Sequence, residues 1–271
     1  PPPGDYRLNS QAQVDGFVLA YPNCEEIEGN LTIGQFVQPV STDISDLSGF
    51  VNLKRVTGDL RLREIDGDEL FDGLQNIAFV GGDLLIERND MLTNLLVFER
   101  LDTINGDLSV RFHQNLTSLF GAGVIKHLGA ALTISSNERL ADIQGFQNLS
   151  SLGSSLQIIA CPLLADLEGL NALESMEGEL RVFNTGIQDF SELGNLQQIS
   201  GTQSGLFIVE NPNLTSLAGL DNLTSIGGGL QIVNNPNLGS LANLASLADI
   251  GGFFEVSESA VENLSGLENA T

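Results

Sequence analysis

Two stretches of 24 residues decide the fold: LLIERNDMLTNLLVFERLDTINGD at 84–107 and LQIVNNPNLGSLANLASLADIGGF at 230–253. Each begins with two apolar residues two positions apart and then places an apolar residue at roughly every third position. The first pair, at offsets 0 and +2, predicts a short strand with one buried face. The run of threes fits neither the period of a strand nor that of a helix, so it predicts an arc whose apolar side chains share one axis.

The same pattern recurs along the whole chain. Its leading apolar residues are Leu31, Leu60, Leu84, Leu108, Leu132, Leu156, Leu180, Leu206, Leu230 and Phe254. Successive spacings are 29, 24, 24, 24, 24, 24, 26, 24 and 24 residues, which gives ten coils with short insertions after Gly34 and at 201–204. No coil contains the amphipathic helix of about ten residues that an ordinary βα repeat needs. We therefore predict a β-solenoid of short parallel strands.

Two columns of equivalent residues support this prediction. Position −2, two residues before each leading residue, is Gly in most coils and Ala or Ser in the others, which is typical of a tight corner. Position +5 is Asn in several coils, where an inward amide can satisfy backbone groups at a buried turn. Its members are Asn89, Asn137, Asn211 and Asn235, and we expect Asn184 to serve in its shorter coil. Cys161 occupies the same position as a buried thiol, too many coils from Cys24 for a disulfide.

Composition and charge exclude several function classes. The chain has 271 residues and is 42% hydrophobic, which excludes a disordered acidic tail. Eleven Lys and Arg against 35 Asp and Glu give a net charge of −24, which argues against nucleic-acid binding by counterion release. No apolar run approaches the roughly 18 residues of a membrane span. The basic residues are unevenly placed, since residues 182–271 contain none.

Little in the sequence supports catalysis. His113 and His127 fall on different parts of successive coils, without a Ser-His-Asp arrangement or a phosphate loop, and we expect both at turns or on the surface. Two cysteines rule out a disulfide-dense scaffold and a cysteine-based zinc site. The sequence therefore predicts a protein that is not an enzyme and that needs no cofactor.

The N-terminal stretch LNSQAQVDGFVLAYPNCEEIEGNLTI, at 8–33, combines a helix cap signal at Asn9 or Ser10, a short helix and a Cys. It resembles the entry to receptor L domains, known from the insulin and epidermal growth factor receptors. Coils such as GGGLQIVNNPNLGSL and SLAGLDNLTSIGG resemble the L-domain-like cell-surface proteins of fungi and other microbes. The resemblance, over about residues 8–271, implies a right-handed parallel β-helix, an extracellular or cell-wall location and a binding or structural role. It also implies a disulfide at the N-terminal Cys, but Cys24 has no neighbouring cysteine.

These observations predict one continuous domain. Residues 1–8 are a Pro-rich linker or a flexible start, 9–28 form an N-terminal cap, and 29–271 form the coils. The sequence ends within a coil and without a capping element, so we expect the natural protein to continue beyond residue 271.

Outward positions −1, +1 and +3 define the candidate partner surface. In the C-terminal half, position +3 becomes apolar, joined by single residues at +1 and −1 and by a neighbouring arginine: Ile159, Phe183, Val209, Val233, Phe207, Phe253 and Arg181. A row of outward apolar side chains on a parallel sheet is unusual unless something covers it. The cover is either a partner or another part of the same protein, such as a loop or flanking sequence. A third interpretation is that the row reflects only the preference of these residue types for strands.

Two charged clusters lie in the N-terminal half. The first comprises Arg61, Arg63, Glu87 and Arg111, whose alternating charges predict pairing across neighbouring strands. Alternatively, its arginines form a polar site for a carboxylate or sulfate group. The second comprises Asp66, Asp68, Glu69 and Asp72, which form either a Ca²⁺ site or a solvated acidic turn.

Seven N-x-S/T sequons are glycosylation candidates: Asn30, Asn115, Asn148, Asn213, Asn222, Asn263 and Asn269. The repeat itself generates NLT and NLS, so we expect about two to four to be occupied in a eukaryote and none in most bacteria.

The leading functional hypothesis is a non-catalytic extracellular recognition or adhesion module that binds a protein or glycan through the outer sheet. One alternative is a structural subunit of a cell-wall or extracellular filament, self-associating end to end. Ice binding ranks last, because the +1 column is not a flat array of threonines.

Overall fold

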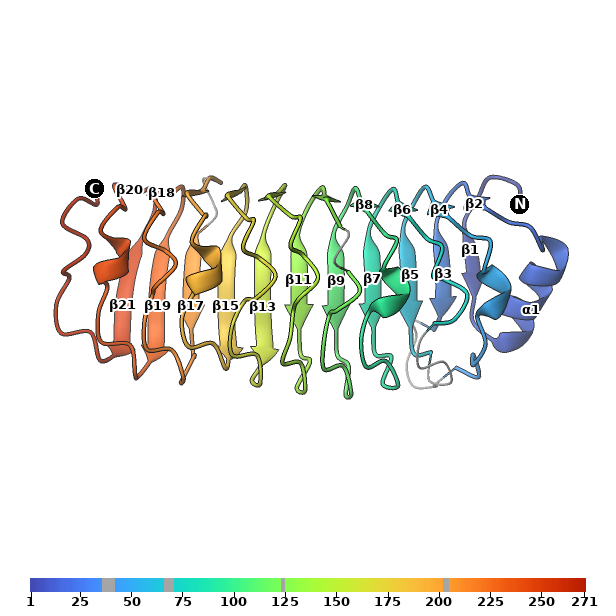
Figure 1. Cartoon of the computed structure of the whole chain (residues 1–271), viewed down its shortest axis with the longest axis horizontal. Coiled ribbons are helices and arrows are strands. Elements are labelled where there is room, and N and C mark those ends of the chain that lie inside the picture. The colour runs from blue at the N-terminus through green and yellow to red at the C-terminus, as the bar shows by residue number, and fades with distance from the viewer. Residues whose placement is uncertain (36–41, 66–70, 123–124, 202–204) are drawn as a thin grey trace.

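The computed structural model describes residues 1–35, 42–65, 71–122, 125–201 and 205–271. The chain winds into a solenoid whose coils stack along one axis, with the two termini at opposite ends (Figure 1). Its principal sheet has eleven strands, each paired in parallel with the equivalent strand of the next coil. The predicted parallel β-solenoid of about ten coils is therefore confirmed.

The principal sheet follows the chain order without crossovers. Its strands are β1 (Tyr6–Leu8), β3 (Leu31–Gly34), β5 (Leu60–Arg63), β7 (Leu84–Glu87), β9 (Leu108–Arg111), β11 (Leu132–Ser135), β13 (Leu156–Cys161), β15 (Leu180–Thr185), β17 (Leu206–Val209), β19 (Leu230–Asn235) and β21 (Phe254–Ser259). The leading residues pair with one another, as in Leu84 with Leu108, so each offset forms a straight column across the strands. A residue's offset therefore decides which surface it joins.

Short strands of two residues each form a second side of the solenoid. One sheet contains β2 (Glu26–Ile27), β4 (Arg55–Val56), β6 (Phe79–Val80), β8 (Thr103–Ile104) and β10 (His127–Leu128). The other contains β12 (Ser151–Leu152), β14 (Ser175–Met176), β16 (Gln198–Ile199), β18 (Ser225–Ile226) and β20 (Asp249–Ile250). Between the two sides lie short 3₁₀ turns: η1 (Ser48–Phe50), η2 (Leu96–Phe98), η3 (Ser191–Leu193) and η4 (Ala242–Leu244). The run of threes is thus an arc that turns corners, as predicted.

The N-terminal segment differs from the expected linker or flexible start. Strand β1 extends the principal sheet, with Tyr6 opposite Leu31. Helix α1 (Gln11–Ala20) follows, and the side chain of its N-cap Ser10 accepts a hydrogen bond from the Gln13 N–H. The cap predicted at Asn9 or Ser10 is therefore present. Aromatic rings pack between α1, β1 and η1 and close this end of the core: Tyr6, Phe17, Tyr21 and Phe50.

One hydrophobic core runs the length of the solenoid. The residues at offsets 0 and +2 are buried in nearly every coil, as are the residues of the run of threes. In the coil that begins at Leu84, the latter are Leu92, Leu95, Phe98, Leu101 and Ile104. Burying a large apolar side chain contributes about 1.5–3 kcal/mol, so the repeated pattern is the main source of stability.

A sharp corner lies at position +4 in each coil from the one that begins at Leu60 to the one that begins at Phe254. The nine non-glycine residues there have φ between 50° and 63°: Glu64, Arg88, Phe112, Ser136, Ala160, Asn184, Glu210, Asn234 and Glu258. This left-handed conformation costs an L-residue about 1–2 kcal/mol, and it redirects the chain so that the +5 side chain points inward. The sequence did not reveal this corner because no glycine marks it.

The +5 asparagines form the predicted internal ladder. Asn137 Oδ1 accepts from the His113 N–H at 3.1 Å, and its Nδ2 donates to the Val110 carbonyl of the preceding coil at 3.0 Å. In the coil that begins at Leu180 the prediction for Asn184 was wrong. Thr185 takes the slot and donates to Asn211 Oδ1 at 2.7 Å, whereas Asn184 is the exposed +4 residue.

His113 also occupies the ladder slot, so it lies at a buried turn, and the alternative that it is on the surface was wrong. Its side chain is 1% exposed and its Nδ1 lies 3.0 Å from the Arg111 carbonyl oxygen. Burial lowers the pKa of His113 to about 4. His127, on β10, is exposed as expected.

Cys161 is buried in the same slot, and burial raises the pKa of its thiol to about 11. Both cysteines are free, in agreement with the expected separation of Cys24 and Cys161.

Candidate ligand-binding face

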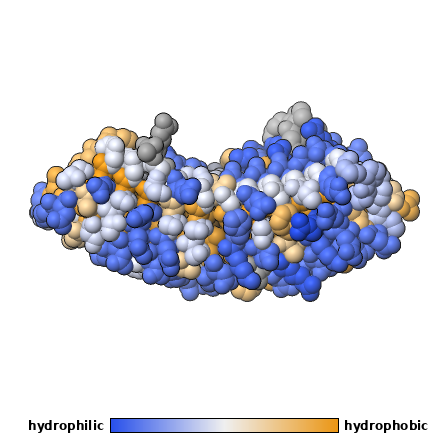
Figure 2. Space-filling model, turned by 90° about the horizontal axis from the view of Figure 1, so that it is seen from above, coloured by the Kyte–Doolittle hydropathy of each residue, from blue (hydrophilic) through white to orange (hydrophobic). Residues whose placement is uncertain are grey.

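The outer face of the principal sheet divides into two regions. The charged hollow is a shallow depression of about 640 Å³, lined by Arg61, Arg63, Asp83, Leu84, Leu85, Glu87, Asp107, Ser109, Arg111, Thr133 and Gln157. The apolar stripe comprises Ile159, Phe183, Phe207, Val209, Val233 and Phe253. Figure 2 shows a rod hollowed along one side, with most of its hydrophobic surface toward the C-terminal half at the left.

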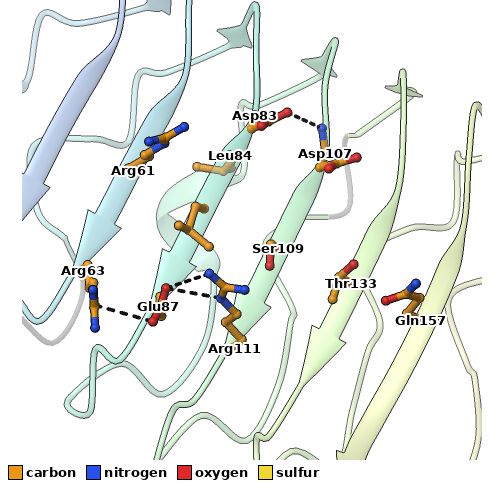
Figure 3. A pocket seen from close by; sticks show the side chains of 11 residues that line it. Arg61, Arg63, Asp83, Leu84, Glu87, Asp107, Ser109, Arg111, Thr133 and Gln157 are labelled. Atoms are coloured by element: carbon orange, nitrogen blue, oxygen red, sulfur yellow. Dashed lines mark hydrogen bonds and ion pairs between the residues drawn. The ribbon is translucent and has the colours of Figure 1, made fainter. Parts of the chain in front are cut away.

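Glu87 is the centre of the charged hollow. Its carboxylate accepts two hydrogen bonds from Arg111, from Nε at 3.2 Å and from Nη2 at 3.0 Å, and it lies 3.5 Å from Arg63 Nε (Figure 3). The three residues stand opposite one another on β5, β7 and β9. Glu87 is only 6% exposed although it lies on the outer face. The expected cross-strand pairing is therefore present, and the guanidinium groups bind this carboxylate.

A column of aspartates edges the hollow and joins the coils. Asp83 Oδ1 accepts from the Asp107 N–H at 2.9 Å, and Asp59 and Asp107 make the same bond to the next coil. The Asp83 carboxylate occupies the space beside Gly106, the residue before Asp107, and only a residue without a side chain leaves that space free. A Cβ added to Gly106 would lie 2.2 Å from Asp83 Oδ1. The Gly-Asp pair repeated at 58–59, 82–83 and 106–107 was the signal for this role, which sequence analysis did not assign.

The apolar stripe contains one row of four side chains in register. Ile159 stands opposite Phe183, Phe183 opposite Val209, and Val209 opposite Val233. All four are partly exposed. The structure thus brings these predicted residues together on four adjacent strands of one face.

An aromatic pair lies beside this row. The rings of Phe207 and Phe253 have centroids 6.2 Å apart, and the Arg181 guanidinium carbon lies 4.6 Å from the Phe207 centroid. Glu179 holds Arg181 through an ion pair of 2.9 Å. Phe207 is thereby only 9% exposed, whereas Phe253 is 53% exposed.

Glycines form the floor beneath these two rings. A Cβ at Gly205 would lie 2.7 Å from the Phe207 ring, and one at Gly229 would lie 2.5 Å from the Phe253 ring. These glycines occupy the −1 column, which carries aspartate in the charged hollow. The rings therefore lie nearly flat on the sheet and extend the apolar stripe sideways.

The carboxylates next to the stripe have no basic residue nearby in the chain. Glu210, Glu255 and Glu258 are exposed, and residues 182–271 contain no Lys or Arg. None of the three makes an ion pair within the described residues. Glu255 accepts a hydrogen bond from Gln231 instead. The stripe therefore combines apolar side chains with unneutralised negative charge.

Of the four proposed Ca²⁺ ligands, the structure describes only Asp72. Asp66, Asp68 and Glu69 lie outside the described residues, and Asp72 is exposed. Among the residues that the structure describes, no group of three or more His, Cys, Asp or Glu could hold a metal ion.

The sequons fall into two groups by their contacts. The amide nitrogens of Asn115, Asn222 and Asn269 donate to a carbonyl of the preceding coil, and the Asn30 oxygen accepts from the Asp59 N–H. The other three, Asn148, Asn213 and Asn263, are exposed, as are Asn222 and Asn269. Occupancy of the seven sites stays a prediction.

The fold places the protein in the class of leucine-rich parallel β-solenoids, and the outer face of its principal sheet is the candidate binding surface. Within the described ranges, no helix is long and apolar enough to span a membrane.

The family model for the receptor L domain matches residues 52–140 and 143–245. These segments together make up more than half of the chain, which therefore belongs to the receptor L domain family, as the resemblance indicated. Domains of this family are non-enzymatic ligand-binding modules, typically in the extracellular parts of receptors. A comparison with curated proteins finds no match.

Proposed function

We propose that this chain is a non-catalytic extracellular recognition or adhesion module that binds a protein or glycan through the outer face of its principal sheet. The observation that carries the proposal is the apolar stripe. A parallel sheet ordinarily has both faces covered, and contiguous exposed apolar surface marks interaction sites. Four partly exposed apolar side chains in register, beside an aromatic pair, form such a surface.

The arrangement of the face supports binding rather than catalysis. The arginines of the face are held in ion pairs with Asp59, Glu87 and Glu179, and the buried His113 lies in the core ladder rather than on the face. A binding site needs rigid side chains more than reactive ones, and strands position side chains more firmly than loops do.

The test is binding of the labelled protein to an array of oligosaccharides and purified extracellular proteins. The double variant Phe183→Asp/Phe207→Ser should lose binding to any partner that the wild type holds, with an affinity at least about tenfold weaker. The single variant Phe183→Asp leaves the Phe207–Arg181 contact intact and should still lose most of the binding.

Circular dichroism and thermal unfolding show whether the variants keep the fold. A partner that binds both variants as tightly as the wild type would refute the assignment to the stripe. The absence of any binder in both classes would refute the function.

A further inference from the structure

We infer that the partner of the apolar stripe is a protein surface in which apolar side chains are interspersed with Lys or Arg. This inference rests on the proposed function and narrows it to one class of partner. It is carried by charge complementarity: Glu210, Glu255 and Glu258 border the stripe and make no ion pair within the described residues, because the nearby Arg181 is paired with Glu179.

The apolar part sets the first requirement. Ile159, Phe183, Val209 and Val233 lie on adjacent strands, so they form a ridge about 14 Å long at a strand spacing of about 4.8 Å. Serines bound the ridge at both ends, Ser135 on β11 and Ser257 on β21. Binding to such a ridge is favourable only when other apolar groups cover it and remove its surface from water.

The acidic border sets the second requirement. Glu210 directly follows Val209 at the exposed corner, Glu258 occupies the same corner two coils later, and Glu255 lies on β21. An acidic or neutral partner would bury these carboxylates without a counter-charge, which is costly. Lys or Arg at the edge of an apolar contact would pair with them and steer association.

The charged hollow shows the contrast within the same molecule. There, Glu87 is neutralised by Arg63 and Arg111 of neighbouring strands, and Asp59 by Arg61. Beside the stripe, the matching cations are missing from the chain, because the last basic residue is Arg181. A partner would supply them.

The experiment selects phage-displayed random short peptides on the immobilised protein. Wild type should select peptides enriched in both apolar residues and Lys or Arg. Two variants should abolish this enrichment: Phe183→Ser/Val209→Ser, which removes the ridge, and Glu210→Lys/Glu258→Lys, which reverses the border. The control Glu99→Lys/Glu138→Lys makes the same change in net charge at exposed positions away from the stripe, and it should keep the selection.

Affinity measurements on the selected peptides complete the test. Each stripe variant should bind about tenfold more weakly than wild type, and raised ionic strength should weaken wild-type binding. Thermal unfolding of each variant shows whether it is folded.

Several outcomes would overturn the inference. Selection of apolar peptides without basic residues would refute the charge requirement. If both stripe variants and the Glu99→Lys/Glu138→Lys control select the same peptides as wild type, the peptides bind elsewhere on the protein. If no peptide is selected while an oligosaccharide binds wild type and not Phe183→Asp/Phe207→Ser, the partner class is wrong and the proposed function stands.

Discussion

The two halves of the outer sheet face share a backbone and differ in what their side chains do. In the N-terminal half, aspartates and arginines link neighbouring coils through hydrogen bonds and ion pairs. In the C-terminal half, glycine replaces aspartate at −1 in the coils that begin at Leu206 and Leu230, and apolar side chains occupy +3 from Ile159 to Val233. The first half of the face stabilises the solenoid, whereas the second half leaves apolar surface available.

This division coincides with the two family matches. Residues 52–140 contain the charged hollow except Gln157, and residues 143–245 contain the stripe except Phe253. The two matched segments nevertheless form one uninterrupted sheet, because β11 pairs with both β9 and β13. Since inward positions maintain the stack, outward positions can change along the rod without changing the fold.

The largest expected effect comes from removing the charge at the centre of the hollow. Glu87→Gln leaves Arg63 and Arg111 without their shared carboxylate, and breaking a buried ion pair costs about 3–5 kcal/mol. Because Arg111 is partly exposed, we expect a loss near the lower value, about 3 kcal/mol. Urea unfolding monitored by circular dichroism measures it.

The matched control lies in the other half. Glu210→Gln removes the same charge from an exposed corner and should change the free energy of unfolding by less than about 0.5 kcal/mol. Equal effects at the two positions would remove the distinction between a structural and an available half.

Acid should weaken the N-terminal half through His113. Its pKa is about 4 in the folded protein and about 6.5 when unfolded, so between these values the unfolded chain binds more protons. The stability contribution is complete above pH 6.5 and declines as the pH falls toward 4, by about 3 kcal/mol.

His113→Asn separates this effect from the titration of carboxylates. An asparagine at this position would continue the ladder between Asn89 and Asn137, and it does not titrate. Urea unfolding of both proteins from pH 7 to pH 4 should show the extra loss in wild type alone. Parallel profiles would mean that His113 accepts a proton in the folded state without penalty.

The inward-facing positions of the fold could be predicted from the sequence, and the corner at +4 could not. Burial repeats with the apolar pattern, so the coils and their register followed from Leu84, Leu108 and their equivalents. The +4 corner has no fixed residue type because its side chain faces solvent, and this is why Asn184 was placed in the ladder and Thr185 was overlooked.

On the outer face, the sequence identified which residues point outward but not how far each is covered. Alternation alone placed Phe207 and Glu87 there. Their near-complete burial depends on side chains from other coils, Arg181 and Phe253 for Phe207 and the arginines for Glu87. Such contacts depend on side-chain conformations, which a repeat pattern does not specify.

The smallest effect tests the corner at the boundary between the two halves. Ala160 has φ of 53°, and glycine adopts this conformation without steric cost. Ala160→Gly relieves that strain but gives the unfolded chain more freedom, so we expect a net gain of only about 0.5 kcal/mol in urea unfolding. Ala160→Val should destabilise by more than about 1 kcal/mol, because a β-branched residue is least tolerated there. If glycine destabilises and valine does not, the left-handed corner is wrong, and so is the inward direction that it gives to the +5 ladder in both halves.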